Sequence, residues 1–407
     1  MNDKYIMEDL ISRSDYIRQI EQFVGKQTII VLTGQRRVGK SYILREWALK
    51  YQENANIIYI DKEQREFDTI ATYQDLNAYI QPRLQVNHTN YILIDEVQEI
   101  EEFEKSLRAY RLEPDCEIIV TGSNAEILSG SLATLLGGRY HEVYIQSLTY
   151  NEYLRFHQLP NSDESLQLYI QTGGLPGLIN YDIRDNKQVQ TYVGDIYNTV
   201  LLKDVILRHQ VRNVPFIKNL CQYMADNTGK LFSGSNISKY MRSNGSSVTT
   251  DLVLRYIAHL CEAYIIAQAK RYDIRGKRIL ETNDKFYYED HGIRNMLVGG
   301  SRETDIEKII ENIVYQELVH RGYSVSVGQL QVGEVDFVAV DKSGGRVYIQ
   351  VAYLIANEET RTREFGRLES IADNYPKYVI SLTPLVTRSD YNGITHLSLR
   401  EFLTNGL

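Results

Sequence analysis

Short continuous runs of apolar residues recur in the N-terminal part of the chain, and helix-length stretches separate them. They lie at 28–33, 57–60, 91–94, 117–120 and 142–145. Uninterrupted apolar runs are typical of strands buried on both faces, and their alternation with helical segments indicates a parallel sheet. The pattern predicts an α/β domain over residues 1–155.

The pattern changes after this domain. Residues 156–215 show helical periodicity and few strand signals, which predicts a small helical lid subdomain. Within 216–300, three helical segments precede a hairpin across Arg275–Lys277, and this order is typical of a winged helix. Residues 301–407 predict a further α/β unit, with a helix near 305–321, another near 360–374, and strands at 323–327, 334–340, 346–351 and 377–381.

Composition narrows the class of protein. With 407 residues, 43% hydrophobic and 24% charged, the chain has the composition of a globular protein of several domains. The net charge of −8 argues against a protein that coats nucleic acid, but residues 216–285 hold 11 Lys and Arg against 6 Asp and Glu. The three cysteines lack metal-site spacing and read as reduced. Without a signal pattern or membrane span, we expect a soluble, cytoplasmic protein.

The residues that follow the first apolar strand give the clearest indication of a binding site. Between that strand and an amphipathic helix, two glycines bound a loop that ends in Lys40 and Ser41, which is the context of a phosphate-binding loop. Backbone N–H groups and the helix N-terminus would cradle phosphates, Lys40 would reach the terminal phosphates, and Ser41 would ligate Mg²⁺. The predicted nucleotide contacts are Gly34, Gln35, Arg36, Arg37, Val38, Gly39, Lys40, Ser41 and Tyr42.

A second signature favours ATP hydrolysis over binding alone. The apolar strand at 91–94 ends in Asp95 and Glu96. Asp95 would hold Mg²⁺, directly or through water, and Glu96 would polarise the attacking water.

Two further positions are candidates near the γ-phosphate. The next strand ends in Thr121-Gly-Ser-Asn124, where Ser123 or Asn124 could orient the water or simply cap the following helix. We assign Asn124 as the candidate sensor, although the residues alone do not separate it from Ser123. Arg139, beside the last strand, could reach a γ-phosphate in cis or in trans, or could be an ordinary surface arginine.

These motifs carry a family resemblance. The segments 34–41, 94–98, 121–124, 136–139 and 147–153 resemble the prokaryotic AAA-type ATPases, members of the AAA+ superfamily, that have a DUF4143 C-terminal region. The resemblance covers nearly the whole chain. It implies an AAA+ core with a five-stranded parallel sheet, a helical lid, a winged helix and a terminal domain like the PD-(D/E)xK nucleases. It supports the roles given to Lys40, Ser41, Asp95, Glu96 and Asn124, but it implies neither substrate nor partner.

The terminal domain departs from the nuclease pattern. Glu311, Asp336 and Gln350 resemble the acidic core of such nucleases, but Ala352 stands where a lysine should orient water. Lys377 or Arg363 could compensate. If neither does, the domain is a degenerate nuclease that no longer cuts and instead binds nucleic acid or protein. A further alternative is that the carboxylates are only structural.

The sequence thus predicts an Mg²⁺-dependent ATPase that cycles between ATP and ADP as a conformational switch or motor. The rivals are an ATP-regulated DNA nuclease and a signalling switch with negligible turnover. The partner would be DNA or a protein, no membrane is expected, and the chain could form a homo-oligomer. Candidate phosphate contacts in the winged helix are Lys239, Arg242, Arg255, Arg275, Lys277 and Arg278.

Overall fold

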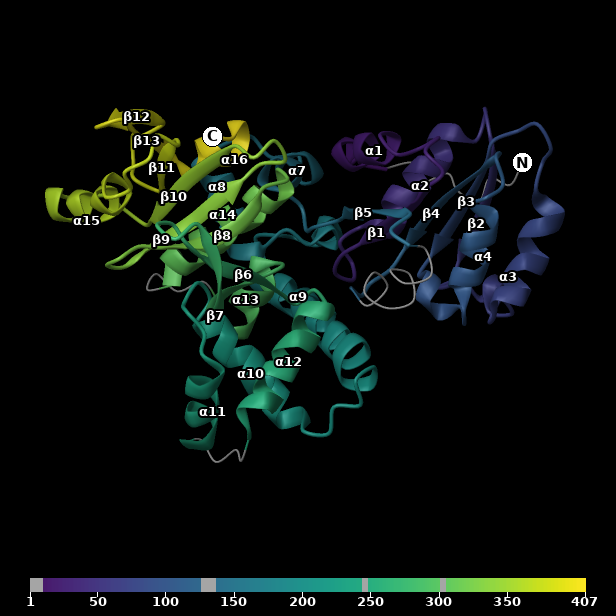
Figure 1. Ribbon diagram of the computed structural model, residues 1–407, viewed down its shortest axis with the longest axis horizontal. Coiled ribbons are helices and arrows are strands. Elements are labelled where there is room, and N and C mark those ends of the chain that lie inside the picture. Colours follow the sequence, from purple (N-terminus) through teal and green to yellow (C-terminus); the bar gives the residue numbers. More distant parts are fainter. Residues whose placement is uncertain (1–9, 126–136, 244–247, 301–304) are drawn as a thin grey trace. The chain divides into compact units, whose positions relative to one another are not determined.

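A computed structural model describes residues 10–125, 137–243, 248–300 and 305–407 (Figure 1). The chain divides into two compact units. The first holds residues 1–145 and 262–264, and the second holds residues 146–261 and 265–407. The first residues of the Leu135–Arg139 motif and the side chain of Arg242 lie outside the described part.

The first unit contains a five-stranded sheet in the order β2-β3-β4-β1-β5, and all its neighbouring strands are parallel. Its strands occupy the predicted apolar runs: β1 (Ile29–Thr33), β2 (Asn56–Asp61), β3 (Asn90–Asp95), β4 (Cys116–Thr121) and β5 (Tyr140–Tyr144). The predicted α/β class and parallel sheet are confirmed.

Helices cover both faces of this sheet, which explains why its inner strands β1, β3 and β4 are largely apolar. Ile29 and Val31 of β1 pack in one core with α3 (Tyr73–Ile80) and α4 (Phe103–Tyr110). Ile30 and Leu32 point the other way and pack with α1 (Ser14–Glu21) and α2 (Lys40–Tyr51).

The second unit combines helices with a mixed sheet. Its helices are α7 (Tyr150–Phe156), α8 (Asp163–Thr172), α9 (Asn186–Val200), α10 (Val214–Asp226), α11 (Gly234–Ser243), α12 (Thr250–Glu262, whose last residue is assigned to the first unit), α13 (His291–Leu297), α14 (Ile306–His320), α15 (Glu358–Glu369) and α16 (Leu399–Asn405). A π-helical segment, Leu201–Leu207, continues α9. Helix α15 ends at Glu369, before the predicted limit near 374. Directly after the helix, Ser370 Oγ donates to the Arg367 carbonyl.

The sheet of the second unit has eight strands in the order β12-β13-β11-β10-β9-β8-β6-β7. The strands are β6 (Ile266–Asp273), β7 (Arg278–Tyr288), β8 (Ser324–Gln329), β9 (Glu334–Val340), β10 (Arg346–Ala352), β11 (Lys377–Ser381), β12 (Arg388–Tyr391) and β13 (Ile394–Ser398). The predicted hairpin across 275–277 is present as β6 and β7. Because β6 also pairs with β8, this hairpin extends the sheet of the C-terminal residues.

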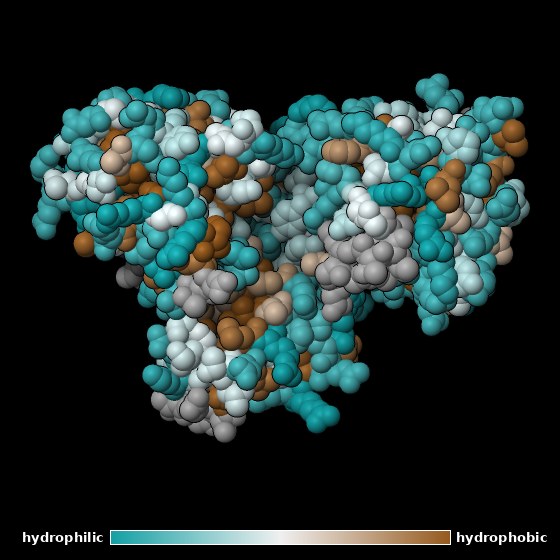
Figure 2. Space-filling model, in the orientation of Figure 1, coloured by the Kyte–Doolittle hydropathy of each residue, from teal (hydrophilic) through white to brown (hydrophobic). Residues whose placement is uncertain are grey.

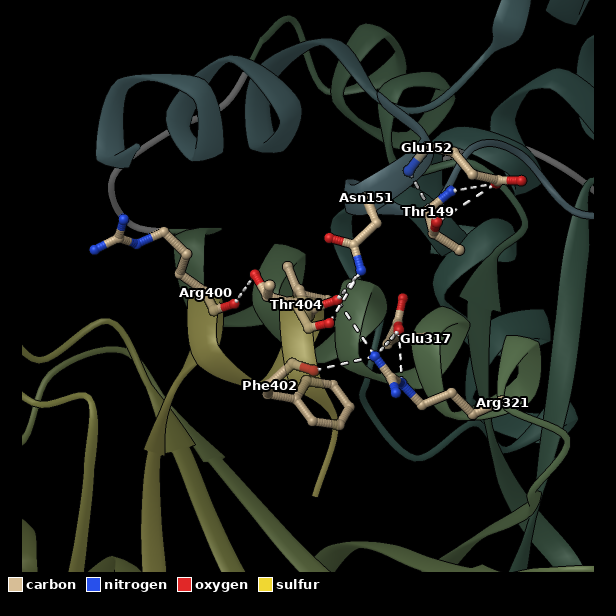
Figure 3. A network of polar contacts seen from close by, with 9 residues as sticks. Thr149, Asn151, Glu152, Glu317, Arg321, Arg400, Phe402 and Thr404 are labelled. Atoms are coloured by element: carbon tan, nitrogen blue, oxygen red, sulfur yellow. Dashed lines mark hydrogen bonds and ion pairs between the residues drawn. The ribbon is translucent and has the colours of Figure 1, made fainter. Parts of the chain in front are cut away.

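A polar network holds the last helix in place (Figure 3). Asn151 Nδ2, on α7, donates to the carbonyls of Leu403 and Thr404 at 3.3 and 3.1 Å. Arg321, which follows α14, donates to the carbonyls of Phe402 and Leu403, both at 3.3 Å, and to Glu317 Oε1 at 2.7 Å. The carbonyls of Leu403 and Thr404, near the end of α16, are therefore satisfied by side chains from other elements, while the Phe402 carbonyl also accepts the Gly406 N–H at 2.9 Å.

Glu317 in this network should make stability depend on pH. Burial raises its pKa to about 7, the nearby Arg321 opposes this rise, and Glu152 adds to it. The folded state thus holds a proton that the unfolded chain releases, so this contribution is complete below about pH 4.5 and is lost as pH rises through about 7. We expect Glu317→Gln to flatten the fall in melting temperature between pH 5 and 8. An exposed control, Glu359→Gln, should keep the wild-type slope. Equal slopes in all three proteins would contradict the assignment.

Candidate functional site

The predicted phosphate loop connects β1 to α2 with backbone that only glycine adopts readily. Gly34 has φ of 132°, and a Cβ there would lie 2.0 Å from the Ile145 carbonyl oxygen. Gly39, the N-cap of α2, has φ of 98° in the left-handed region. Both glycines therefore have a conformational reason to be present, and α2 presents its N-terminus to the loop.

Two polar side chains are buried in this loop. Lys40 is only 4% exposed, and its Nζ donates to the carbonyls of Gly34 and Gln35 at 2.8 and 2.9 Å. Gln35 is 2% exposed, and neither atom of its side-chain amide has a hydrogen-bond partner among the described residues. A buried amide of this kind is costly unless a ligand supplies its hydrogen bonds. The loop therefore fits a phosphate group.

Asp95, the last residue of β3, is held by two hydroxyl groups. Thr121 Oγ1 donates to Asp95 Oδ1 at 2.5 Å, and the Ser41 hydroxyl is hydrogen-bonded to the same carboxyl. Burial raises the pKa of Asp95 to about 6, these two hydrogen bonds oppose the rise, and the charges of Glu96 and Asp61 add to it. Ser41 and Asp95, predicted separately, are thus brought together as an oxygen-rich pair that suits Mg²⁺.

Glu96 lies beside Asp95 with left-handed backbone, at φ of 54°. Its N–H donates to Thr121 Oγ1 at 2.9 Å, Ser123 Oγ donates to its Oε2 at 3.1 Å, and Gln98 also donates to this carboxylate. Arg36 Nη1 lies 3.8 Å from the same oxygen. Strained backbone that its surroundings hold in place is common at functional sites.

Ser123 and Asn124 are both fully buried, and the Ser123 hydroxyl contacts Glu96. Sequence reasoning missed Thr121, whose single hydroxyl joins both acidic residues. The signal for it was its place as the last residue of β4, because β3 and β4 pair in parallel and end at one edge. It also missed Asp61, which pairs with Asp95 across β2 and β3 and lies 3.1 Å from Arg45.

Arg139 and Tyr42 lie outside this cluster. Arg139 is exposed and precedes β5, which pairs in parallel with β1 from Ile29 onward. The loop follows the other end of β1, so the two are separated by a five-residue strand, roughly 16 Å. Tyr42, on α2, is 48% exposed beside Arg45.

In the second unit, Glu311 on α14 and Asp336 on β9 both contact Lys285, which the sequence did not single out. Gln350 on β10 is buried. Lys377 Nζ donates to the Asp373 carbonyl and Arg363 Nε to Glu364. The basic residues predicted to contact phosphate whose side chains are described are all exposed: Lys239, Arg255, Arg275, Lys277 and Arg278.

Comparison with known proteins decides the family. A model described as an AAA domain matches residues 26–154, and a domain of unknown function, DUF8612, matches residues 163–304. An uncharacterized protein of Haemophilus influenzae is 35% identical over 91% of this chain and 93% of its own length. The chain belongs to this family of AAA-type ATPases. The model that matches its second region is DUF8612, whereas the sequence resemblance suggested DUF4143.

Other similarities of this AAA-type ATPase are more distant. An uncharacterized protein of Methanocaldococcus jannaschii is 26% identical over 86% of this chain and 80% of its own length. The Walker-type ATPase paby2304 of Pyrococcus abyssi has a TM-score of 0.51 and 18% identity, covering 71% of this chain and 96% of that one. At this identity the structural match supports the fold alone.

The face drawn in Figure 2 is mostly hydrophilic, with smaller apolar areas. Within the described ranges, no helix is long and apolar enough to cross a membrane.

The position of Thr121 predicts that its hydroxyl supports turnover. Thr121→Val keeps the shape but removes both hydrogen bonds, so we expect ATP turnover to fall about 10–100-fold, as is common when a group that orients a metal ligand is lost. Thr121→Ser keeps the hydroxyl and should stay within a few-fold of wild type. Phosphate-release assays at saturating Mg²⁺ would measure both. A valine variant as active as the serine variant would contradict this role.

Proposed function

We propose that this AAA-type ATPase binds ATP with Mg²⁺ at Gly34–Ser41 and hydrolyses it through Glu96. We further propose that the cycle drives a conformational switch or motor that acts on a partner of the second unit. The observation that carries the proposal is the array at one sheet edge, where Ser41, Asp95, Thr121 and Glu96 are linked by hydrogen bonds.

Each residue of the array has a role in this proposal. Lys40 and the N-terminus of α2 bind the phosphates, because an ammonium and free backbone N–H groups favour anions. Ser41 and Asp95 would hold Mg²⁺, which when bound neutralises phosphate charge. Gln35 supplies a buried amide that a phosphate oxygen or its hydration could satisfy.

Glu96 is the proposed base that orients the attacking water. Its carboxylate is held by Ser123 and Gln98 with Arg36 nearby, so its position depends on the end of β4. This contact supports Ser123 as the residue that senses the γ-phosphate region through Glu96. Asn124, the sensor expected from the sequence, remains a second candidate because it is buried on the same segment.

DNA is the favoured partner of the second unit, because five exposed basic side chains lie on α11, α12 and the β6–β7 turn. Exposed Lys and Arg bind phosphates with little sequence specificity. A protein partner and an ATP-regulated nuclease are the alternatives. ATP turnover that rises on addition of duplex DNA, and falls as salt increases, would support DNA.

Two substitutions separate nucleotide binding from hydrolysis. Lys40→Ala removes the buried charge that is proposed to contact the phosphates. We expect the free energy of ATP binding to weaken by about 2–5 kcal/mol, which lowers the affinity for ATP roughly 30-fold or more. Glu96→Gln keeps the shape and should bind ATP as wild type does but lose turnover. Fluorescent-nucleotide titration and phosphate release measure the two properties. Wild-type affinity in Lys40→Ala would refute the loop assignment, and wild-type turnover in Glu96→Gln would refute the base assignment.

The place of Arg139 makes a separate prediction. Because Arg139 lies at the opposite end of β1 from its own loop, we propose that it acts on the nucleotide of a neighbouring copy. Arg139→Ala and Lys40→Ala should each lack ATPase activity alone. Mixing them should restore part of this activity, because the Arg139→Ala chain supplies an intact phosphate loop and the Lys40→Ala chain supplies the arginine. Wild-type activity per chain should also rise with protein concentration. No recovery on mixing, with concentration-independent wild-type activity, would place the reaction within one chain.

A further inference from the structure

A buried lysine joins the acidic residues of the nuclease-like region. Lys285, on β7, is 1% exposed. Its Nζ lies 2.9 Å from Glu334 Oε1, 3.0 Å from Glu311 Oε1 and 3.6 Å from Asp336 Oδ1. One ammonium thus contacts carboxylates from both α14 and β9.

The carboxylates keep this lysine charged. Burial alone would lower the pKa of Lys285, but Glu311, Asp336 and Glu334 raise it above its ordinary value. Lys285 compensates the carboxylates only in part, since three acidic groups surround one cation. Burial raises the pKa of Glu311 to about 7, with Lys285 opposing and Asp336 adding to the rise, while the Tyr287 hydroxyl donates to Glu311 at 2.6 Å.

A fourth buried oxygen lies beside Asp336. Strands β9 and β10 pair Tyr348 with Val338 and Ile349 with Phe337, so the register carried one residue further sets Gln350 beside Asp336 on the same face. Gln350 is 2% exposed, and its Oε1 accepts no hydrogen bond from any described residue. Asp336 Oδ2, by contrast, accepts from the Val351 N–H at 2.9 Å.

Carboxylate and amide oxygens are the ligands that Mg²⁺, Mn²⁺ and Ca²⁺ prefer. In this cluster they surround an ammonium that reaches them from a different strand. A primary ammonium has three donors, and its neighbours here are three acidic oxygens. The side chain of Glu334 is 28% exposed, which leaves the cluster an approach from solvent.

We propose that Lys285 is a built-in cation that takes the place of a divalent metal ion between Glu311, Glu334 and Asp336, with Gln350 beside them. The wild-type chain then holds no divalent metal at this cluster and does not cut DNA there. The same ammonium fixes β7, the second strand of the hairpin, to α14 and β9. The C-terminal domain keeps the oxygen ligands of a metal site but uses them as a structural anchor.

Removal of the ammonium should expose a metal site. Lys285→Met keeps much of the side-chain volume without its charge. We expect this variant, as nucleotide-free, full-length protein, to bind one more Mn²⁺ per chain than wild type. Binding is measured from the electron paramagnetic resonance signal of free Mn²⁺. The added site should be lost in Lys285→Met/Asp336→Asn. A folded Lys285→Met protein that gains no Mn²⁺ would overturn the proposal.

The wild-type background gives a second test that needs no change at Lys285. Wild type and Asp336→Asn should bind the same amount of Mn²⁺, because the ammonium already occupies the cluster. Supercoiled plasmid incubated with either protein and Mn²⁺ should stay uncut at equal levels. The proposal would be overturned if wild type bound Mn²⁺ or nicked the plasmid and Asp336→Asn abolished that binding or nicking. Such a result would place a metal ion beside Lys285, and Lys285 would then act as the lysine of a nuclease.

Discussion

The proposed nucleotide site depends on the contacts that the hydroxyl of Thr121 makes. It donates to the carboxylate of Asp95 and accepts the backbone N–H of Glu96, so it fixes the two acidic residues relative to β4. The contact exists because β3 and β4 pair in parallel and end at one edge, beside the loop that follows β1. In a parallel sheet covered on both faces, that edge is where polar side chains can meet a ligand.

The second unit uses charged groups differently. In the first unit, the buried amide of Gln35 has no hydrogen-bond partner among the described residues, whereas the carboxylates of Glu311 and Asp336 have an internal ammonium as partner. Lys285 also joins the β6–β7 hairpin to the C-terminal sheet, in addition to the pairing of β6 with β8. A partner bound by the exposed basic residues of the hairpin would therefore contact the same compact unit that holds the acidic cluster.

Sequence reasoning succeeded where local pattern determines structure. The three inner strands of the first sheet could be predicted because each is a buried apolar run. Lys40 and Ser41 remain predictions from the glycine-bounded loop, and Asp95 and Glu96 from the end of a strand. Thr121 and Asp61 were missed because register, not local sequence, brings them to Asp95. Lys285 was missed for a similar reason, since a lysine in a hairpin strand usually faces solvent and only the packing of α14 and β9 shows otherwise. Strands β12 and β13 were missed because they are short and only partly apolar.

The most direct measurement of the central claim is steady-state phosphate release by the purified wild-type chain from ATP. It would compare Mg²⁺ with EDTA, and each with and without duplex DNA, and the DNA would be recovered and examined for breaks. The account predicts release that requires Mg²⁺ and DNA that remains intact. Tight ATP binding with no phosphate release under any of these conditions would contradict it, and would make the protein a nucleotide-dependent switch.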